Sequence, residues 1–111
     1  MIDLKVRKEI GRDQAYQNAL KELRAKIDIA DNQLLETLSR RMKISDEIGQ
    51  VKASQNVAIL QSKRWNEILG KMILEGEQLG LSEEFMLRIY KAIHQESINH
   101  QEKVAKAIKA S

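Results

Sequence analysis

The chain contains neither cysteine nor proline, and aromatic residues make up only 4% of its 111 residues. The absence of cysteine excludes disulfide bonds and thiolate-ligated zinc, and it fits a reducing, cytoplasmic compartment. Apolar runs are only a few residues long, so we expect no segment that spans a bilayer. Residues 1–14 also lack the apolar centre that an export signal needs, and we expect no such signal.

The positive net charge is not spread along the chain. The formal charge is +3 and the isoelectric point is about 9.2. Residues 1–12 carry four basic and two acidic side chains, and residues 102–111 carry three basic and one acidic, so the rest is nearly neutral. A nucleic-acid-binding protein usually shows a basic stripe with aromatic residues close to it. We therefore expect no nucleic-acid partner.

Helical periodicity dominates the pattern of apolar residues. Between Leu20 and Val51 they recur every three or four positions, which predicts a helix from about residues 13–19 to Ala53. A polar break at residues 54–56 precedes a second predicted helix at about residues 58–78. Gly80 suits the left-handed position after a helix, and Ser82 suits the N-cap of a third helix over about residues 83–107.

The length of the first predicted helix implies a partner chain. A helix of 35–40 residues is about 55 Å long, whereas a compact chain of this size has a radius of gyration of about 13 Å. Two shorter helices cannot cover the apolar face of such a rod. We therefore predict an all-α fold of one long and two shorter helices that forms an obligate two-fold homodimer.

Several polar residues interrupt the apolar faces. On the first predicted helix Arg41 and Lys52 differ by only about 20° around the axis and lie about 16 Å apart, so both can reach one ligand. Arg24 lies about 100° away from Arg41, which suits a site on the partner's rod better than one on its own. Ser97 and Gln101 are four residues apart and share one helix face.

Plain structural interpretations compete with a binding site. A lone Arg or Lys on a helix is usually a solvated charge, and Ser97 and Gln101 alone are common helix polar groups. Trp65 is expected in the core or at an interface. His94 and His100 are six residues apart, which does not place them on one face, so we expect no metal site.

The pattern resembles the all-α chorismate mutase family over about residues 19–105. The resemblance rests on three helices in register, with the residues Leu23, Arg24, Asp28, Asp31, Arg41, Gly49, Lys52, Arg64, Gly80, Ser97 and Gln101. It implies an intertwined helical homodimer with two equivalent sites. Residues 1–18 would then form an arm or a linker remnant, and residues 106–111 a tail.

The resemblance also implies a reaction, the rearrangement of chorismate to prephenate in phenylalanine and tyrosine biosynthesis. This step is unimolecular and pericyclic, so it needs no nucleophile, metal or redox cofactor. The substrate carries two carboxylates, which cationic side chains can hold in the folded reactive geometry. Negative charge develops on the ether oxygen, where fixed donors stabilise the transition state more than the substrate.

The resemblance assigns the carboxylate-binding groups. Arg41 and Arg24 of the partner subunit would clamp carboxylate, and Ser97 would bind the ring carboxylate. Arg64 would add positive field and order the loop before the second helix. Lys52 would meet a carboxylate as well as the ether oxygen.

Gln101 would be the second donor to the ether oxygen.

Two positions around the start of the second predicted helix depart from the family pattern. Many members carry an acid where this chain has Trp65, and that acid binds the substrate hydroxyl. Many also carry Asp where this chain has Gln61. Either Gln61 or loop backbone groups take the hydroxyl, or the register slips and moves the basic role of Arg64 to Lys63.

Alternatives concern both the setting and the activity. Residues 1–18 fit the end of a linker from a fused enzyme, such as 3-deoxy-7-phosphoheptulonate synthase, or the short arm of a free-standing enzyme. An isochorismate-pyruvate lyase uses the same fold and a similar cationic site. A non-catalytic helical dimer with a regulatory role would have no need of this set of polar residues.

Overall fold

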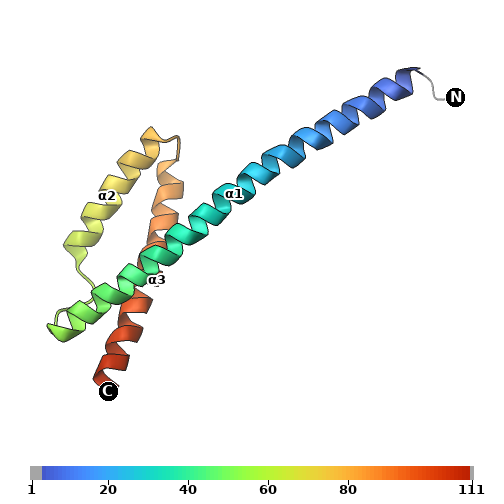
Figure 1. Ribbon diagram of the computed structural model, residues 1–111. Coiled ribbons are helices and arrows are strands. Elements are labelled where there is room, and N and C mark those ends of the chain that lie inside the picture. Colours follow the sequence, from blue (N-terminus) through green and yellow to red (C-terminus); the bar gives the residue numbers. More distant parts are fainter. Residues whose placement is uncertain (1–3, 111) are drawn as a thin grey trace. The chain divides into compact units, whose positions relative to one another are not determined.

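The computed structural model describes the backbone of residues 4–110 and the side chains of residues 11–110. It contains three helices, α1 (Leu4–Ser54), α2 (Ser62–Gln78) and α3 (Glu83–Ala110), and residues 4–110 form no strand (Figure 1). The all-α fold with one long and two shorter helices is therefore confirmed. No helix in the described residues is long and apolar enough to cross a membrane.

The first helix begins earlier than its apolar pattern predicted. It starts at Leu4 rather than at residues 13–19, and it continues through Gly11. A single glycine costs about 1 kcal/mol in a helix, and the residues around Gly11 are mostly good helix formers. The helix ends at Ser54, next to the predicted end at Ala53, and Asn56 then takes a left-handed φ of 54°.

The chain divides into two compact units, residues 1–38 and residues 39–111, and α1 contributes to both. The described part of the first unit, residues 4–38, is helical, and most of its described side chains are open to solvent. Large apolar side chains are among them, with exposed fractions of 48–64% at Tyr16, Leu23, Ile27, Ile29, Leu34 and Leu35. Within one chain, the described side chains of this unit, residues 11–38, therefore form no buried apolar core.

The turn between α2 and α3 is built as the sequence predicted. Gly80 has a φ of 81°, which a residue without a Cβ adopts at little cost. The amide of Leu81 donates to the carbonyl of Gly76 at 2.8 Å and that of Gly80 donates to Glu77 at 3.1 Å, which together form a Schellman motif. The hydroxyl of Ser82 then accepts the amide of Phe85 at 3.2 Å and caps α3.

The centre of the second unit is unusually polar. Helices α2 and α3 pack together, and Gly76 leaves space for the Met86 side chain, which a Cβ at position 76 would approach to 2.6 Å. Met86 is the one apolar side chain that is buried among those the structure describes. The other buried side chains are the polar Ser45, Ser97 and Gln101, with exposed fractions of 3–7%.

Candidate active site

A pocket of about 530 Å³ lies in the second unit, between the C-terminal part of α1, the α2 N-terminus and the middle of α3. Its apolar wall consists of Ile44, Ile48, Ile59, Ile68 and Ile98. Its polar wall consists of Arg41, Ser45, Lys52, Gln61, Arg64, Trp65, His94, Ser97 and Gln101. Three of these lining residues are Arg or Lys and none is acidic, so the pocket suits an anion.

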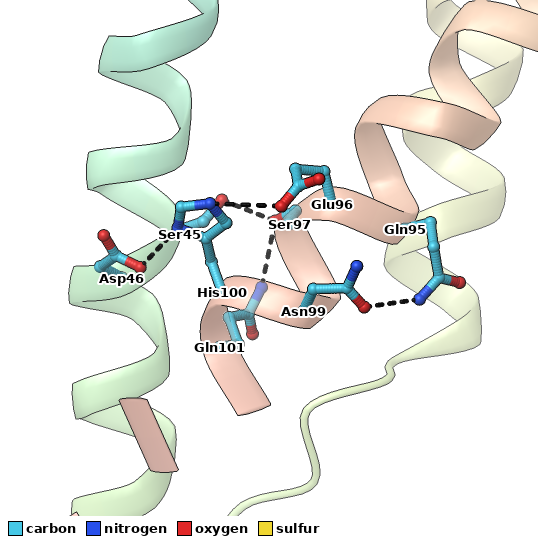
Figure 2. A network of polar contacts seen from close by, with 8 residues as sticks. All are labelled: Ser45, Asp46, Gln95, Glu96, Ser97, Asn99, His100 and Gln101. Carbon is cyan, nitrogen blue, oxygen red and sulfur yellow. Dashed lines mark hydrogen bonds and ion pairs between the residues drawn. The ribbon is translucent and has the colours of Figure 1, made fainter. Parts of the chain in front are cut away.

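A chain of hydrogen bonds crosses the pocket from α1 to α3 and back. The hydroxyls of Ser45 and Ser97 lie 2.6 Å apart, and the amide nitrogen of Gln101 donates to the Ser97 hydroxyl at 3.3 Å (Figure 2). The side-chain oxygen of Gln101 accepts a hydrogen bond from Lys52 at 2.9 Å. These four residues therefore hold one another in fixed positions.

Lys52 also orders the loop that leads into α2. Its ammonium donates to the backbone carbonyl of Ile59 at 2.6 Å, which ties residues 55–61 to the end of α1. An ammonium has three N–H groups, so the two bonds made within the described residues leave one for a bound molecule. Burial lowers the pKa of the Lys52 ammonium, because water solvates the charge less well there.

A glycine allows this part of α1 to approach α3. A Cβ at Gly49 would lie 2.9 Å from the Cα of Gln101 and 3.2 Å from its carbonyl oxygen. Only a residue without a side chain fits so close to another helix backbone. The close approach brings Lys52, one turn further along α1, within hydrogen-bonding distance of Gln101.

Trp65 and His94 form an aromatic wall between α2 and α3. Their rings are stacked, with centroids 4.0 Å apart and planes inclined by 19°. The pKa of His94 is lowered by burial first, and then by the positive charges of Arg41 and Lys52. At neutral pH this imidazole is therefore an uncharged group in a positively charged pocket.

Comparison with protein families agrees with this geometry. Residues 23–102 match the family model described as chorismate mutase type II, which is about three quarters of the chain. The chain belongs to the chorismate mutase type II family. The match includes all three helices of the structure, from the middle of α1 to most of α3.

Curated proteins similar to the chain carry several names. The chain is 28% identical to the T-protein of Haemophilus influenzae, over 75% of this chain and 22% of that protein. It is 33% identical to a bifunctional chorismate mutase/prephenate dehydratase of Aquifex aeolicus, over 77% of this chain and 24% of that protein. A 4-amino-4-deoxychorismate mutase of Streptomyces venezuelae is 31% identical, over 69% of this chain and 75% of that protein.

The chain thus spans about a quarter of the length of the T-protein and of the bifunctional relative. The bifunctional name joins a chorismate mutase to a prephenate dehydratase in one protein. None of these relatives is named for a 3-deoxy-7-phosphoheptulonate synthase, which was one of the two settings considered for residues 1–18.

The structure brings six of the seven predicted site residues to one pocket. These are Arg41, Lys52, Gln61, Arg64, Ser97 and Gln101. Arg24 belongs to the first unit and is not among the residues that line the pocket. Lys63 does not line it either, so the register with Arg64 in the basic position agrees with the geometry.

Three residues of the polar wall were not predicted as part of the site. Ser45 lies four residues after Arg41 and seven before Lys52, so helical spacing alone places it on their face. His94 lies three residues before Ser97 and shares its face for the same reason. Trp65 was expected in the core or at an interface. It is half-buried in the pocket wall, where its ring stacks on that of His94.

Proposed function

We propose that this chain catalyses the rearrangement of chorismate to prephenate, a step of phenylalanine and tyrosine biosynthesis. The observation that carries the proposal is the pocket itself, in which Arg41 and Arg64 accompany a pair of hydrogen-bond donors, Lys52 and Gln101. Family membership supports the same activity. No acidic residue among the described lining residues opposes the binding of a dianion.

The substrate carboxylates are held by the guanidinium and ammonium groups of the pocket. Arg41 is half-buried, so an ion pair formed with it is screened less by water than one on the open surface. Arg64 is exposed at the α2 N-terminus and adds positive field at the entrance. Ser97 is buried and binds the ring carboxylate through its hydroxyl.

Lys52 and Gln101 stabilise the ether oxygen as its bond to carbon breaks. Each keeps one N–H beyond the bonds described above, since an ammonium has three donors and a side-chain amide has two. Donors that are fixed before the reaction stabilise the developing charge without reorganisation at the moment of bond cleavage. The rearrangement is unimolecular, so no nucleophile, metal or cofactor takes part in the proposed mechanism.

Gln61 is our candidate for the group that binds the substrate hydroxyl. It lies at the N-cap of α2 and lines the pocket, and its side chain makes no capping hydrogen bond there. An amide can both donate to and accept from a hydroxyl. The described lining residues offer no carboxylate to an ammonium group, which favours chorismate over its 4-amino-4-deoxy analogue.

The proposal includes an intertwined homodimer in which Arg24 of the partner subunit completes each site. The exposed apolar side chains of the first unit, such as Leu23, Ile27 and Leu35, support it, because a second rod would remove them from water. Residues 19–105 form the catalytic domain in this proposal, with residues 1–18 as an arm or linker. A cytoplasmic location fits the absence of cysteine.

An assay with three candidate substrates tests the activity. The purified chain is supplied with chorismate, and prephenate formation is followed. Parallel reactions contain isochorismate, with pyruvate as the product measured, and the 4-amino-4-deoxy analogue. Prephenate formation from chorismate supports the proposal. Pyruvate release without prephenate would identify a lyase. If a bicyclic dicarboxylate mimic of the transition state does not bind in calorimetry, the chain is a non-catalytic dimer.

Subunit complementation tests the shared site. Arg24→Ala and Lys52→Ala are each expected to be inactive alone, since every site lacks one group. In a heterodimer of the two variants one of the two sites contains both residues. A freely exchanged equimolar mixture, in which half the dimers are mixed, should therefore recover about a quarter of the wild-type sites. A mixture that stays inactive after exchange would show that Arg24 does not act in the partner's site, and an active Arg24→Ala variant would place Arg24 outside the site.

A further inference from the structure

His100 lies outside the pocket but is bracketed by two carboxylates. Its Nδ1 lies 2.9 Å from a carboxylate oxygen of Asp46 on α1, and its Nε2 lies 3.4 Å from one of Glu96 on α3 (Figure 2). The ring is half-buried, with an exposed side-chain fraction of 35%. His100 does not belong to the described lining of the pocket.

Each member of this bridge is next in sequence to a residue of the pocket. Asp46 directly follows Ser45, and His100 directly precedes Gln101. Consecutive residues on a helix point about 100° apart, so the bridge and the pocket groups occupy different faces of the same turns. The contact between Asp46 and His100 therefore also fixes the helix turns that carry Ser45 and Gln101.

The polar contacts of the pocket depend on this register between α1 and α3. The Ser45–Ser97 contact of 2.6 Å and the Lys52–Gln101 contact of 2.9 Å both join these two helices. The helices touch through Gly49, which has no side chain that could interlock with α3. A contact through glycine alone opposes rotation of α3 only weakly, so the polar bridge beside it adds to the constraint that these hydrogen bonds supply.

We propose that His100 is a positioning residue that, through Asp46 and Glu96, fixes α3 against α1 and so aligns Gln101 with Lys52 for the reaction. This inference rests on the proposed mutase activity. An imidazolium donates to both carboxylates, whereas a neutral imidazole donates to only one. Misplacement of a donor by about 1 Å can reduce turnover by as much as 10²-fold, so a small rotation of α3 is enough to matter.

The test compares three variants for kcat and KM. His100→Ala removes the bridge and should lower kcat by about tenfold, with KM changed much less, because the pocket cations stay in place. His100→Lys places a donor between the carboxylates and should recover part of the loss. Asn99→Ala is the matched control, since its exposed side chain accepts a hydrogen bond from Gln95 and does not line the pocket.

A double-mutant cycle separates positioning from general loss of stability. If Asp46 acts through His100, adding Asp46→Ala to His100→Ala should lower kcat little further. Additive losses, or a His100→Ala variant with wild-type kcat, would overturn the proposal. So would a fall in kcat that only follows the unfolded fraction measured by circular dichroism.

A substrate-free measurement keeps this inference distinct from the proposed function. The side-chain amide resonances of Gln101 should shift in His100→Ala and stay unchanged in Asn99→Ala. If wild-type protein does not convert chorismate, the mutase proposal fails while these resonances still test the bridge. If wild-type protein is active and neither kcat nor the Gln101 resonances respond to His100→Ala, the positioning role fails alone.

Discussion

Gly49 lies against the backbone of Gln101, and a Cβ at position 49 would lie 2.9 Å from the Gln101 Cα. This contact sets the spacing between α1 and α3 at the pocket. Because Lys52 follows Gly49 by three residues, the same contact brings its ammonium to the Gln101 side chain. One glycine thus links the packing of the helices to the geometry of the two proposed donors.

Gly49→Ala should therefore cost both stability and activity. The added methyl group meets backbone atoms rather than a flexible side chain, so α3 must move away from α1. We expect a loss of about 1–3 kcal/mol in the free energy of unfolding, as for other overpacked sites. Denaturant unfolding at a fixed protein concentration measures it, and kcat should fall as the Lys52–Gln101 contact lengthens.

Gly70→Ala is the control for the effect of helix propensity. Gly70 lies within α2, and a Cβ there would meet no described atom within 4 Å. The change should stabilise the protein by up to about 1 kcal/mol through propensity alone. Equal effects at the two glycines would contradict a close approach at Gly49.

Lys52→Ala should abolish most of the activity and leave the fold intact. Loss of one fixed donor costs about 3–4 kcal/mol of barrier in comparable sites, so kcat should fall at least a hundredfold. Circular dichroism and sedimentation should match wild type, because Lys52 contributes polar contacts rather than core packing. An unimpaired Lys52→Ala enzyme would refute the donor role.

Neighbouring basic residues at the start of α2 should differ sharply in their effect. Arg64 lines the pocket, so Arg64→Ala should raise KM for the anionic substrate. Lys63 does not line it, so Lys63→Ala should leave the kinetic constants unchanged. The reverse result would show that the basic role lies at Lys63.

Activity should fall at alkaline pH when the half-buried Lys52 ammonium loses its proton. Burial lowers its pKa below the ordinary value of 10.5, so Lys52 loses its proton at a lower pH than an exposed lysine. The proposed mechanism needs the protonated form, and kcat/KM should therefore fall as pH rises through this lowered pKa. Carbon NMR of the lysine Cε resonances should show Lys52 titrating before the exposed lysines.

Acid should destabilise the fold through His94. Its folded-state pKa is below the value of 6.5, so between the two values the unfolded chain binds more protons than the native one. The contribution of uncharged His94 to the free energy of unfolding is fully present above the pKa of the unfolded chain. It is lost as the pH falls through the pKa of the folded protein. His94→Phe keeps a ring against Trp65 and cannot titrate. Its free energy of unfolding should fall less than that of wild type between neutral and mildly acidic pH.

Local patterns in the sequence were enough to predict the helices and one turn. Apolar spacing indicated all three helices. The residue types at Gly80 and Ser82 indicated the turn, because helix caps and left-handed residues depend only on nearby backbone atoms. The helical period also put Arg41 with Lys52, and Ser97 with Gln101. It did not predict the start of α1 at Leu4, because good helix formers carry a helix through Gly11 without an apolar stripe.

What the sequence determined by itself is which residues share a face of one helix, since that depends only on the 3.6-residue period. Only the tertiary structure decided which faces meet, because such contacts join residues far apart in the chain. It brought Ser45 to Ser97, Trp65 to His94, and Asp46 to His100. These pairings depend on how closely the helices approach one another, which no periodic pattern encodes.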